Sequence, residues 1–312
     1  MIPIMADGLP PSFVDLLGGD FEIHEWNAQS AASVCEQIQA LVTYGHPCVD
    51  GPLLDRFPNL KVVSNHGVGV DHIDVPAAEL RGVPVGNTPG CLDQTTADMT
   101  MALLLAVARN IAVGDRYARS PEFTHYDPAI LIGKEVSGST LGIVGLGRIG
   151  KQVAKRALSF DMTILYHNRN RDQAAEKSLG VRYASFEELL KTSDFVSLNC
   201  PLTAATTGMI STDELALMKP DAMLINMARG PVVDTAALYE ALANQRIAGA
   251  GLDVTDPEPL PRDHPLLKLS NVVIAPHLGS ATDRTRRRMM EMTIENLRAG
   301  LSGADLPYRV RR

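Results

Sequence analysis

Short apolar runs alternate with amphipathic stretches from the start of the chain. The apolar runs are rich in Val, Ile and Leu, which is typical of buried strands, and the stretches between them have helical spacing. The first series of predicted strands covers 2–7, 21–26, 40–44, 60–65 and 83–87, with helices at 12–19 and 30–39. A second series covers 139–145, 162–168, 194–200, 222–228, 247–254 and 271–277. This alternation predicts the α/β class, with two parallel sheets that follow one another along the chain.

Two longer helical stretches set the expected domain organisation. One, 95–119, lies between the two series of strands, and the other, 281–302, follows the second series. If the last helix packs back on the first sheet, the first domain is discontinuous. We therefore expect one domain from 1–98 and 285–312 and a second from 99–284. A chain of 312 residues is long enough to bury two such cores.

Composition narrows the possible partners. A formal net charge of −7 argues against nucleic acid or an anionic membrane as the main partner, since both require a basic face. The longest apolar stretch, Met99 to Ala108, is shorter than the roughly 20 residues that span a bilayer, which predicts a buried helix. The four cysteines show no metal-binding spacing and fit a reducing compartment. We expect a cytoplasmic protein with no metal site.

A glycine-rich segment opens the second series of strands. The segment STLGIVGLGRIG places Gly145, Gly147 and Gly150 in G-x-G-x-x-G spacing, between a predicted strand and a predicted helix. The first glycine allows a tight turn, the second lets backbone N–H groups approach a pyrophosphate, and the third lets the helix lie close to the sheet. The helix N-terminus then faces the phosphates. The spacing and its context predict a dinucleotide site.

The next predicted strand ends in ILYHNRNR, where such sites usually carry an acidic residue for the ribose 2′-hydroxyl. Here Asn168 can donate a hydrogen bond, and Arg169 and Arg171 supply positive charge. A carboxylate would repel a 2′-phosphate, so the sequence favours NADP(H), with NAD(H) still possible. The alternative is that these arginines are solvated loop residues, paired with Asp172, and that either cofactor binds.

Three polar residues follow strands further along the chain: Arg229, Glu258 and His277. Carboxyl ends of strands are where α/β sheets bind ligands, so the three side chains are expected to converge. Hydride addition to a keto carbon leaves an oxyanion that a histidine can protonate, with a neighbouring carboxylate to fix its tautomer. An arginine can bind a substrate carboxylate and polarise the carbonyl. Each residue alone also has an ordinary explanation as a loop or surface residue.

Several motifs carry a family resemblance. In order, GLGRIG, INMARGPVVD, GAGLDVTDPEP and APHLGSAT resemble the motifs of the D-isomer-specific 2-hydroxyacid dehydrogenases, and NHGVGVDHID resembles that family's substrate loop. Nearly the whole chain is covered. The sequence is most similar to the NADPH-preferring glyoxylate/hydroxypyruvate reductases. The resemblance implies a discontinuous flavodoxin-like substrate domain, a Rossmann cofactor domain, a homodimer, and reduction of glyoxylate or hydroxypyruvate, with phenylpyruvate and 2-ketogluconate as further candidates.

The resemblance also implies roles for individual residues. His277 would be the acid/base, Glu258 its partner and Arg229 the substrate-binding arginine. Val68 and Gly69 would bind the substrate carboxylate through backbone N–H groups. Further cofactor contacts implied by position are Leu146, Arg148, Ile149, Cys200, Pro201, Thr206, Met227, Ala228, Asp253 and Gly279.

The chain departs from the family in two places. Related reductases carry a tryptophan in the loop before the glycine motif, whereas here that loop is RSPEFTHYDPAILIG, with His125 or Tyr126 as candidate replacements. Asp256 stands close to Glu258 and could compete for the histidine, although the family motif favours Glu258. Two alternatives stay open: an NAD(H)-dependent D-2-hydroxyacid dehydrogenase with another substrate, and a nucleotide-sensing protein related to corepressors. The basic run at Arg284, Arg286, Arg287 and Arg288 is expected to form a solvated helical face.

Overall fold

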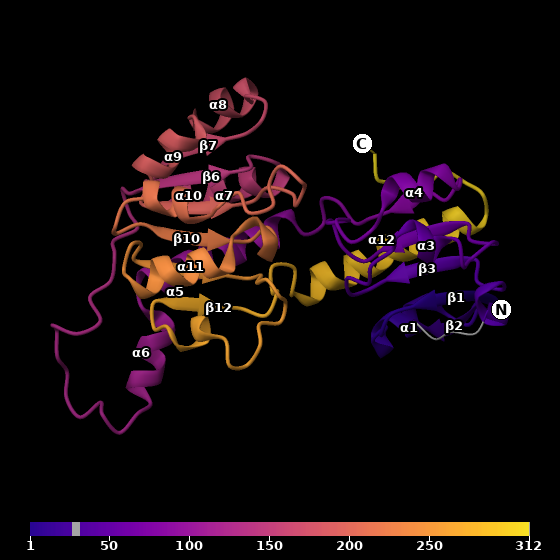
Figure 1. Cartoon of the computed structure of the whole chain (residues 1–312), viewed down its shortest axis with the longest axis horizontal. Coiled ribbons are helices and arrows are strands. Elements are labelled where there is room, and N and C mark those ends of the chain that lie inside the picture. The colour runs from indigo at the N-terminus through magenta and orange to yellow at the C-terminus, as the bar shows by residue number, and fades with distance from the viewer. Residues whose placement is uncertain (27–31, 312) are drawn as a thin grey trace. The chain divides into compact units, whose positions relative to one another are not determined.

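A computed structural model describes residues 1–26 and 32–311. The chain divides into two compact units, Met1–Leu92 with Thr282–Arg312 (unit 1) and Asp93–Ala281 (unit 2). Each unit contains one parallel sheet with helices, so the predicted α/β class with two parallel sheets is confirmed (Figure 1). Part of the predicted helix at 30–39 lies outside the described residues.

The sheet of unit 1 has five parallel strands in the order β2-β1-β3-β4-β5. Its strands are β1 (Ile2–Ala6), β2 (Phe21–Glu25), β3 (Ala40–Thr43), β4 (Val62–Asn65) and β5 (Val85–Gly86). The central strands are buried on both faces, which is why they read as continuous apolar runs in the sequence.

The helices of unit 1 are α1 (Pro11–Leu17), α2 (Ala32–Cys35), α3 (Gly51–Leu54), α4 (Val75–Leu80) and α12 (Asp283–Leu301). Helix α12 packs on the sheet although it follows the whole of unit 2 in sequence. Ser64 in β4 donates a hydrogen bond to the Thr293 carbonyl at 2.8 Å. A side chain at Gly300 would overlap Val62, so the glycine lets the helix approach β4 closely. The apolar side chains Ile294 and Leu297 join the same core.

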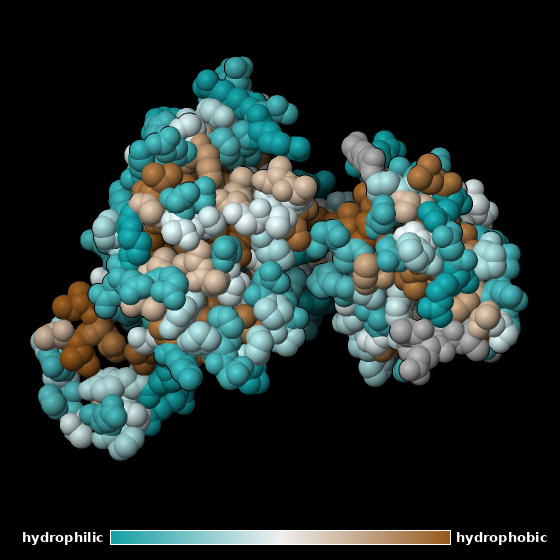
Figure 2. Space-filling model, in the orientation of Figure 1, coloured by the Kyte–Doolittle hydropathy of each residue, from teal (hydrophilic) through white to brown (hydrophobic). Residues whose placement is uncertain are grey.

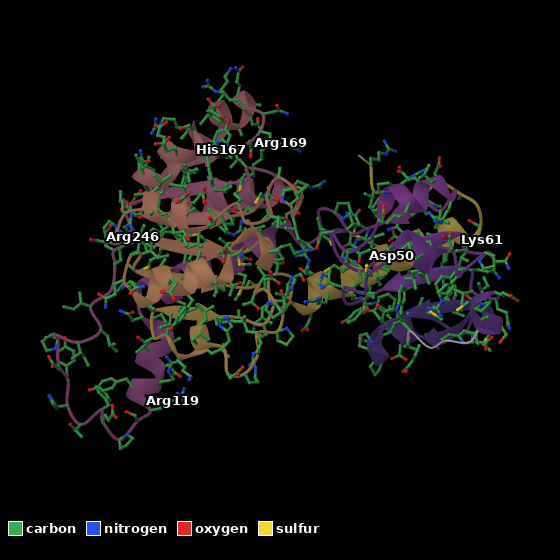
Figure 3. All side chains as sticks on the ribbon, in the orientation of Figure 1. Asp50, Lys61, Arg119, His167, Arg169 and Arg246 are labelled. Carbon is green, nitrogen blue, oxygen red and sulfur yellow. The ribbon has the colours of Figure 1, made fainter. Side chains whose placement is uncertain are left out.

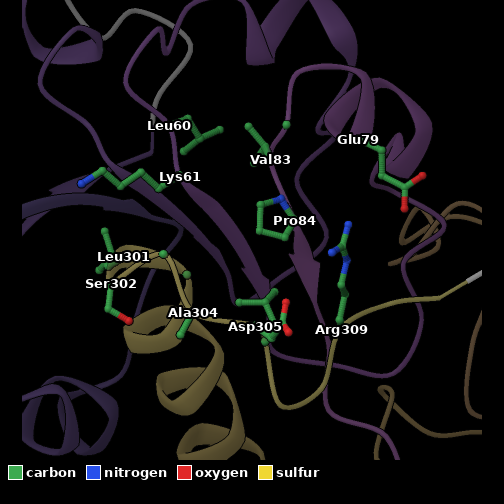
Figure 4. A pocket seen from close by; sticks show the side chains of 14 residues that line it. Leu60, Lys61, Glu79, Val83, Pro84, Leu301, Ser302, Ala304, Asp305 and Arg309 are labelled. Atoms are coloured by element: carbon green, nitrogen blue, oxygen red, sulfur yellow. The ribbon is translucent and has the colours of Figure 1, made fainter.

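Unit 1 has a polar pocket of about 580 Å³ at the amino ends of β4 and β5 and the carboxyl end of α12. Lys61 and Arg309 bring positive charge to its lining, and Glu79 and Asp305 bring negative charge (Figure 4). The loop that carries Val68 and Gly69 follows the opposite, carboxyl end of β4.

The sheet of unit 2 has seven parallel strands in the order β12-β11-β10-β9-β6-β7-β8. The strands are β6 (Thr140–Val144), β7 (Thr163–His167), β8 (Arg182–Tyr183), β9 (Phe195–Leu198), β10 (Met223–Asn226), β11 (Gly249–Leu252) and β12 (Val272–Ile274). The strand order reverses direction between β6 and β9. In doubly wound sheets this switch point, at the carboxyl edge, is where a dinucleotide binds.

The helices of unit 2 are α5 (Asp93–Ala108), α6 (Ile111–Ala118), α7 (Arg148–Leu158), α8 (Gln173–Leu179), α9 (Phe186–Thr192), α10 (Thr212–Leu217) and α11 (Thr235–Ala243). Two short 3₁₀ turns, η1 (Gly230–Val232) and η2 (Pro265–Lys268), complete the unit.

The expectation of one continuous helix at 95–119 is wrong. Helices α5 and α6 are separated by Asn110, whose φ of 54° lies in the left-handed region and stops the helix. Its side chain donates to the Leu131 carbonyl at 3.2 Å. No single helix in the described part of the chain is long and apolar enough to cross a bilayer. The α5–α6 pair reaches that length only when joined across its 61° bend, and half of the residues of α5 are buried.

A long segment without regular structure joins α6 to β6 and carries several exposed apolar side chains. Phe123, Tyr126 and Ile132 are exposed there, as is Ile111 in α6. Figure 2 shows hydrophobic side chains gathered beside α6 on this part of unit 2. Exposed apolar residues that cluster in this way often mark an interaction surface.

Candidate active site

The glycine segment forms a tight connection between β6 and α7. Gly145 has a φ of 99°, and a Cβ there would lie 2.7 Å from the Cys200 backbone nitrogen. A Cβ at Gly150 would overlap the Gly145 carbonyl, so this glycine lets α7 begin directly against the loop. At Gly147 nothing lies within 4 Å of a Cβ position, which leaves open space in front of the helix N-terminus. This geometry fits a pyrophosphate group.

Two of the predicted loop contacts have partners within the protein. The Leu146 N–H donates to the Asn168 side-chain oxygen at 2.7 Å, and the Leu146 side chain is buried. Arg148 reaches Asp93 with an Nε–Oδ2 distance of 3.0 Å. The remaining donors of the first helical turn, from Gly147 to Ile149, lack intrahelical partners and are suited to bind phosphate. Since the oxygen of Asn168 is engaged, its amino group is the part that can donate to a ligand.

The charged residues after β7 are not paired as in the alternative expectation from sequence, in which the arginines pair with Asp172. Asp172 does not pair with an arginine: it lies 2.7 Å from Lys151 Nζ and caps α8. Arg171 instead forms a two-point contact with Glu176, with Nε–Oε1 2.7 Å and Nη2–Oε2 2.6 Å. Glu176 is four residues beyond Asp172, on the first turn of α8, where sequence reasoning did not look for a partner.

The loops after β10, β11 and β12 carry the three candidate catalytic residues. These strands are parallel neighbours in the sheet, so their carboxyl ends lie at one edge. Gly230, which follows Arg229, packs so closely on the Thr255 carbonyl that a Cβ would overlap it. The first two loops therefore touch, and the contact between Glu258 and His277 joins the second to the third.

The Arg229 turn is held by a buried asparagine. Asn226, at the end of β10, accepts from the Ala228 N–H and donates to the Arg229 carbonyl, both at 3.0 Å. Arg229 is partly buried, and its Nη1 donates to the Ala228 carbonyl at 2.9 Å. Met227 and Ala228 are themselves buried beside it.

His277 has a left-handed backbone, with a φ of 57°, a conformation that is uncommon for residues other than glycine. Asp253 holds this conformation. Its carbonyl accepts the His277 N–H at 2.9 Å, and its carboxylate accepts the N–H groups of Leu278 at 2.6 Å and Gly279 at 2.8 Å. Burial raises the pKa of Asp253, and the two backbone hydrogen bonds oppose that rise. Asp253 thus fixes the direction in which the His277 side chain leaves the chain.

The imidazole of His277 is hydrogen-bonded to Glu258, with an Nδ1–Oε1 distance of 2.7 Å. Their side chains are 32% and 39% exposed, so both remain within reach of a ligand. The contact turns Nδ1 toward the carboxylate and leaves Nε2 on the far side of the ring. Of Asp256 and Glu258, it is therefore Glu258 that contacts this histidine.

The loop after β9 contains the remaining candidates for cofactor contact. Cys200 lies next to Gly145, at the switch point of the sheet. Thr206 does not point its hydroxyl outward as a lone donor: it donates to the Pro201 carbonyl at 2.7 Å and accepts from the Thr203 N–H at 2.8 Å. Both contacts stabilise the loop itself.

In unit 1, the loop after β4 has an ordered backbone. Asn65 donates to the carbonyls of Gly67 and Gly69 at 3.1 and 2.9 Å, and Asn87 donates to the Val68 carbonyl at 2.9 Å. Because C=O and N–H point in opposite directions across a trans peptide, the N–H groups of Val68 and Gly69 are turned away from these asparagines.

Sequence reasoning missed the residues that support the site. Asn65, Asn226 and Asp253 were either passed over or given another role, yet each is buried and holds the backbone of a site loop. The available signal was a polar residue at the end of an apolar strand, which must find hydrogen-bond partners when buried. The arginine run on α12 is partly paired: Arg287 and Arg288 contact Glu291.

A glycine loop at the switch point of a parallel sheet, with a histidine–glutamate pair beside an arginine at the same edge, is the arrangement of a dinucleotide-dependent oxidoreductase. Residues 101–279 match the model of the "D-isomer specific 2-hydroxyacid dehydrogenase, NAD binding domain" family. The chain belongs to the D-isomer-specific 2-hydroxyacid dehydrogenase family, as its motifs predicted.

Individual relatives agree with this membership. A glyoxylate reductase of Korarchaeum cryptofilum is 47% identical over 93% of this chain and 90% of its own. A glyoxylate reductase of Thermococcus litoralis is 45% identical over 97% and 95% of the two chains. Among solved structures, an NADPH-dependent glyoxylate/hydroxypyruvate reductase from Sinorhizobium meliloti, in complex with NADP and malonate, superposes with a TM-score of 0.91 at 33% identity, covering 99% and 98%.

Proposed function

We propose that the protein reduces small 2-keto acids, glyoxylate and hydroxypyruvate first among them, to D-2-hydroxy acids with NADPH. The observation that carries the proposal is the 2.7 Å contact of Glu258 with His277, on loops that touch the Arg229 turn. The names of the similar proteins favour the same substrates.

The residues that would hold the cofactor are those around the glycine loop, with Gly147, Arg148 and Ile149 at the phosphates and Asn168 with Arg169 at the adenosine end. The loops at Cys200, Met227 and Asp253 line the rest of the same edge. When bound, reduced nicotinamide supplies the hydride that adds to the keto carbon. Gly279 and Ala228 would be among the residues that contact this part of the cofactor.

His277 would donate a proton to the oxygen of the keto group as negative charge develops there. Its Nε2 is the donating atom, since Nδ1 faces Glu258. Glu258 stabilises the charged imidazolium before transfer and keeps the ring in one orientation afterwards. In the reverse direction, the same Nε2 accepts the hydroxyl proton.

Arg229 would bind the substrate carboxylate and polarise the keto group. Val68 and Gly69 would bind the carboxylate through their N–H groups, which makes unit 1, corresponding to the expected domain 1–98 and 285–312, the substrate domain. Unit 2, corresponding to 99–284, would be the cofactor domain.

We further propose a cytoplasmic homodimer. The exposed apolar side chains of α6 and the following loop, Phe123, Tyr126 and Ile132 among them, are the surface through which two copies would pair. In such a dimer His125 or Tyr126 would take the place of the tryptophan that related reductases carry in this loop.

The proposal is tested by following NADPH and NADH absorbance with glyoxylate, hydroxypyruvate, phenylpyruvate and 2-ketogluconate. We expect the largest kcat/KM with NADPH and one of the two smaller acids. Turnover only with NADH, or only with the larger acids, would move the protein to another branch of the family. Absence of turnover with every acid, despite nucleotide binding, would favour a nucleotide-sensing function.

The preference for NADPH is tested separately with Arg169→Ala. The variant should raise the KM for NADPH roughly tenfold or more, and that for NADH by less than about twofold, since a phosphate contact is lost only in the first case. Arg182→Ala is the matched control, because Arg182 is an exposed arginine of the same unit that pairs with Glu188. Equal effects of Arg169→Ala on both cofactors would make this stretch an ordinary surface turn.

A further inference from the structure

The turn after β7 contains two arginines in different electrostatic states. Arg171 is held by both oxygens of Glu176. Arg169 is exposed, and no carboxylate among the described residues pairs with it. Figure 3 labels Arg169 near His167, at this end of β7. The cationic turn therefore has one neutralised arginine and one whose charge is available to a ligand.

Glu176 is the centre of a small network rather than a surface charge with a chance partner. Its side chain is only 17% exposed, and its Oε1 also accepts the Tyr166 hydroxyl at 2.7 Å. The same hydroxyl accepts the Asp172 N–H at 2.8 Å. Tyr166 is fully buried in the core of unit 2, so Glu176 is attached to a rigid point.

The charges of the network are stable near neutral pH. Hydrogen bonds from Arg171 and then Tyr166 lower the pKa of Glu176 to about 2. Burial, followed by the hydrogen bond to Glu176, raises the pKa of Tyr166 to about 12. Glu176 is therefore anionic near neutral pH, and in the hydrogen bond between the two side chains the Tyr166 hydroxyl is the donor.

We propose that Glu176 is a specificity-determining residue that limits the preference for a 2′-phosphate, by neutralising Arg171 and leaving Arg169 as the main phosphate-reading cation. The inference rests on the proposed cofactor site. In this inference Glu176 acts by neutralising the charge of Arg171 and does not itself contact the cofactor. The other acid of the turn, Asp172, is already neutralised by Lys151, so Glu176 is the carboxylate whose removal would expose an arginine.

The substitution Glu176→Gln removes the charge and keeps the shape. The amide oxygen can still accept from Arg171 Nε and from the Tyr166 hydroxyl. The amide nitrogen cannot accept from Arg171 Nη2, so the two-point contact becomes a one-point contact. Arg171 then carries an uncompensated positive charge. Loss of one nearby negative charge should tighten binding of a 2′-phosphate about three- to tenfold, an effect that salt weakens.

The test measures binding of 2′,5′-ADP and 5′-AMP to the intact protein by calorimetry, with no catalysis involved. We expect Glu176→Gln to lower the Kd for 2′,5′-ADP about three- to tenfold and to change the Kd for 5′-AMP less than about twofold. The gain in affinity for 2′,5′-ADP should become smaller in high salt. Glu188→Gln is the matched control, since Glu188 pairs with the exposed Arg182 in the same unit. In this control variant the ratio of the two Kd values, for 2′,5′-ADP and for 5′-AMP, should equal that of the wild type.

The outcomes separate the inference from the proposed cofactor preference. If the wild type does not distinguish the two nucleotides but Glu176→Gln does, the NADPH preference fails and the role of Glu176 stands. If the wild type prefers 2′,5′-ADP and Glu176→Gln leaves the ratio unchanged, or Glu188→Gln changes it equally, the role of Glu176 is refuted. If no variant binds either nucleotide, both proposals fall. A thermal unfolding curve for each variant excludes misfolding as the cause.

Discussion

The hydrogen bond between Glu258 and His277 can be tested by removing the charge and keeping the shape. In Glu258→Gln the amide oxygen can still accept from Nδ1, so the ring orientation survives while the negative charge is lost. Hydrogen bonds to charged groups contribute about 1.5–3 kcal/mol when desolvated. Since both side chains are about one third exposed, we take the lower end of that range.

A loss of about 1.5 kcal/mol in the transition state corresponds to a roughly tenfold fall in kcat. We expect that fall in steady-state reduction of glyoxylate, with the KM for glyoxylate and the Kd for NADPH nearly unchanged, because in the proposed mechanism Glu258 acts through the proton donor, His277. Glu258→Ala also removes the orienting contact and should reduce kcat about tenfold further.

Asp256→Asn is the matched control, because it removes an exposed acid from the same turn. It should leave kcat within about twofold of the wild type. If Asp256→Asn reduces kcat and Glu258→Gln does not, the assignment of the histidine partner is wrong. A fall in NADPH affinity equal to the fall in kcat would show instead that the turn is structural.

Three further predictions concern the framework of the site. Asp253→Asn can satisfy only one of the two N–H groups that follow His277, so the free energy of unfolding should fall by about 1–3 kcal/mol, measured by denaturant titration; an unchanged midpoint would contradict this. Gly230→Ala places a methyl group on the Thr255 carbonyl, so the free energy of unfolding should fall by about 1–3 kcal/mol and activity should be lost. Normal activity and stability of this variant would show that the two loops can separate. Because the pKa of Glu176 is lowered from 4.5 to about 2, its stabilising effect is fully present above pH 4.5 and is lost as the pH falls toward 2, so thermal unfolding of the wild type should depend more steeply on pH in that window than that of Glu176→Gln.

The fold was largely predictable because its strands are buried on both faces. Apolar runs bounded by turn residues located eleven strands of the two sheets, although each was predicted one to four residues too long. The two-residue edge strand β8 was missed, since it has too few residues for a periodic pattern. The break at Asn110 was missed because apolar residues continue on both sides of it, and a single left-handed residue leaves no periodic signal.

The candidate site residues that follow strand ends were predictable from sequence, and the hydrogen bonds and ion pairs that hold them were not. Topology brings the ends of β10, β11 and β12 together, so Arg229, Glu258 and His277 could be selected from sequence. The partner of Arg171 could not, because Asp172 and Glu176 are both near in sequence and only the helix geometry decides between them. The left-handed backbone at His277 was equally invisible, since it depends on hydrogen bonds to a residue far away in the chain.

The most direct test of the central claim is single-turnover reduction of glyoxylate by NADPH in His277→Ala, with NADPH affinity measured in parallel by fluorescence. If His277 supplies the proton, the rate of NADPH oxidation should fall by about 10²–10⁴ while the Kd for NADPH stays within about twofold of the wild type. A near-normal rate in this variant would contradict the role of His277 and with it the proposed mechanism.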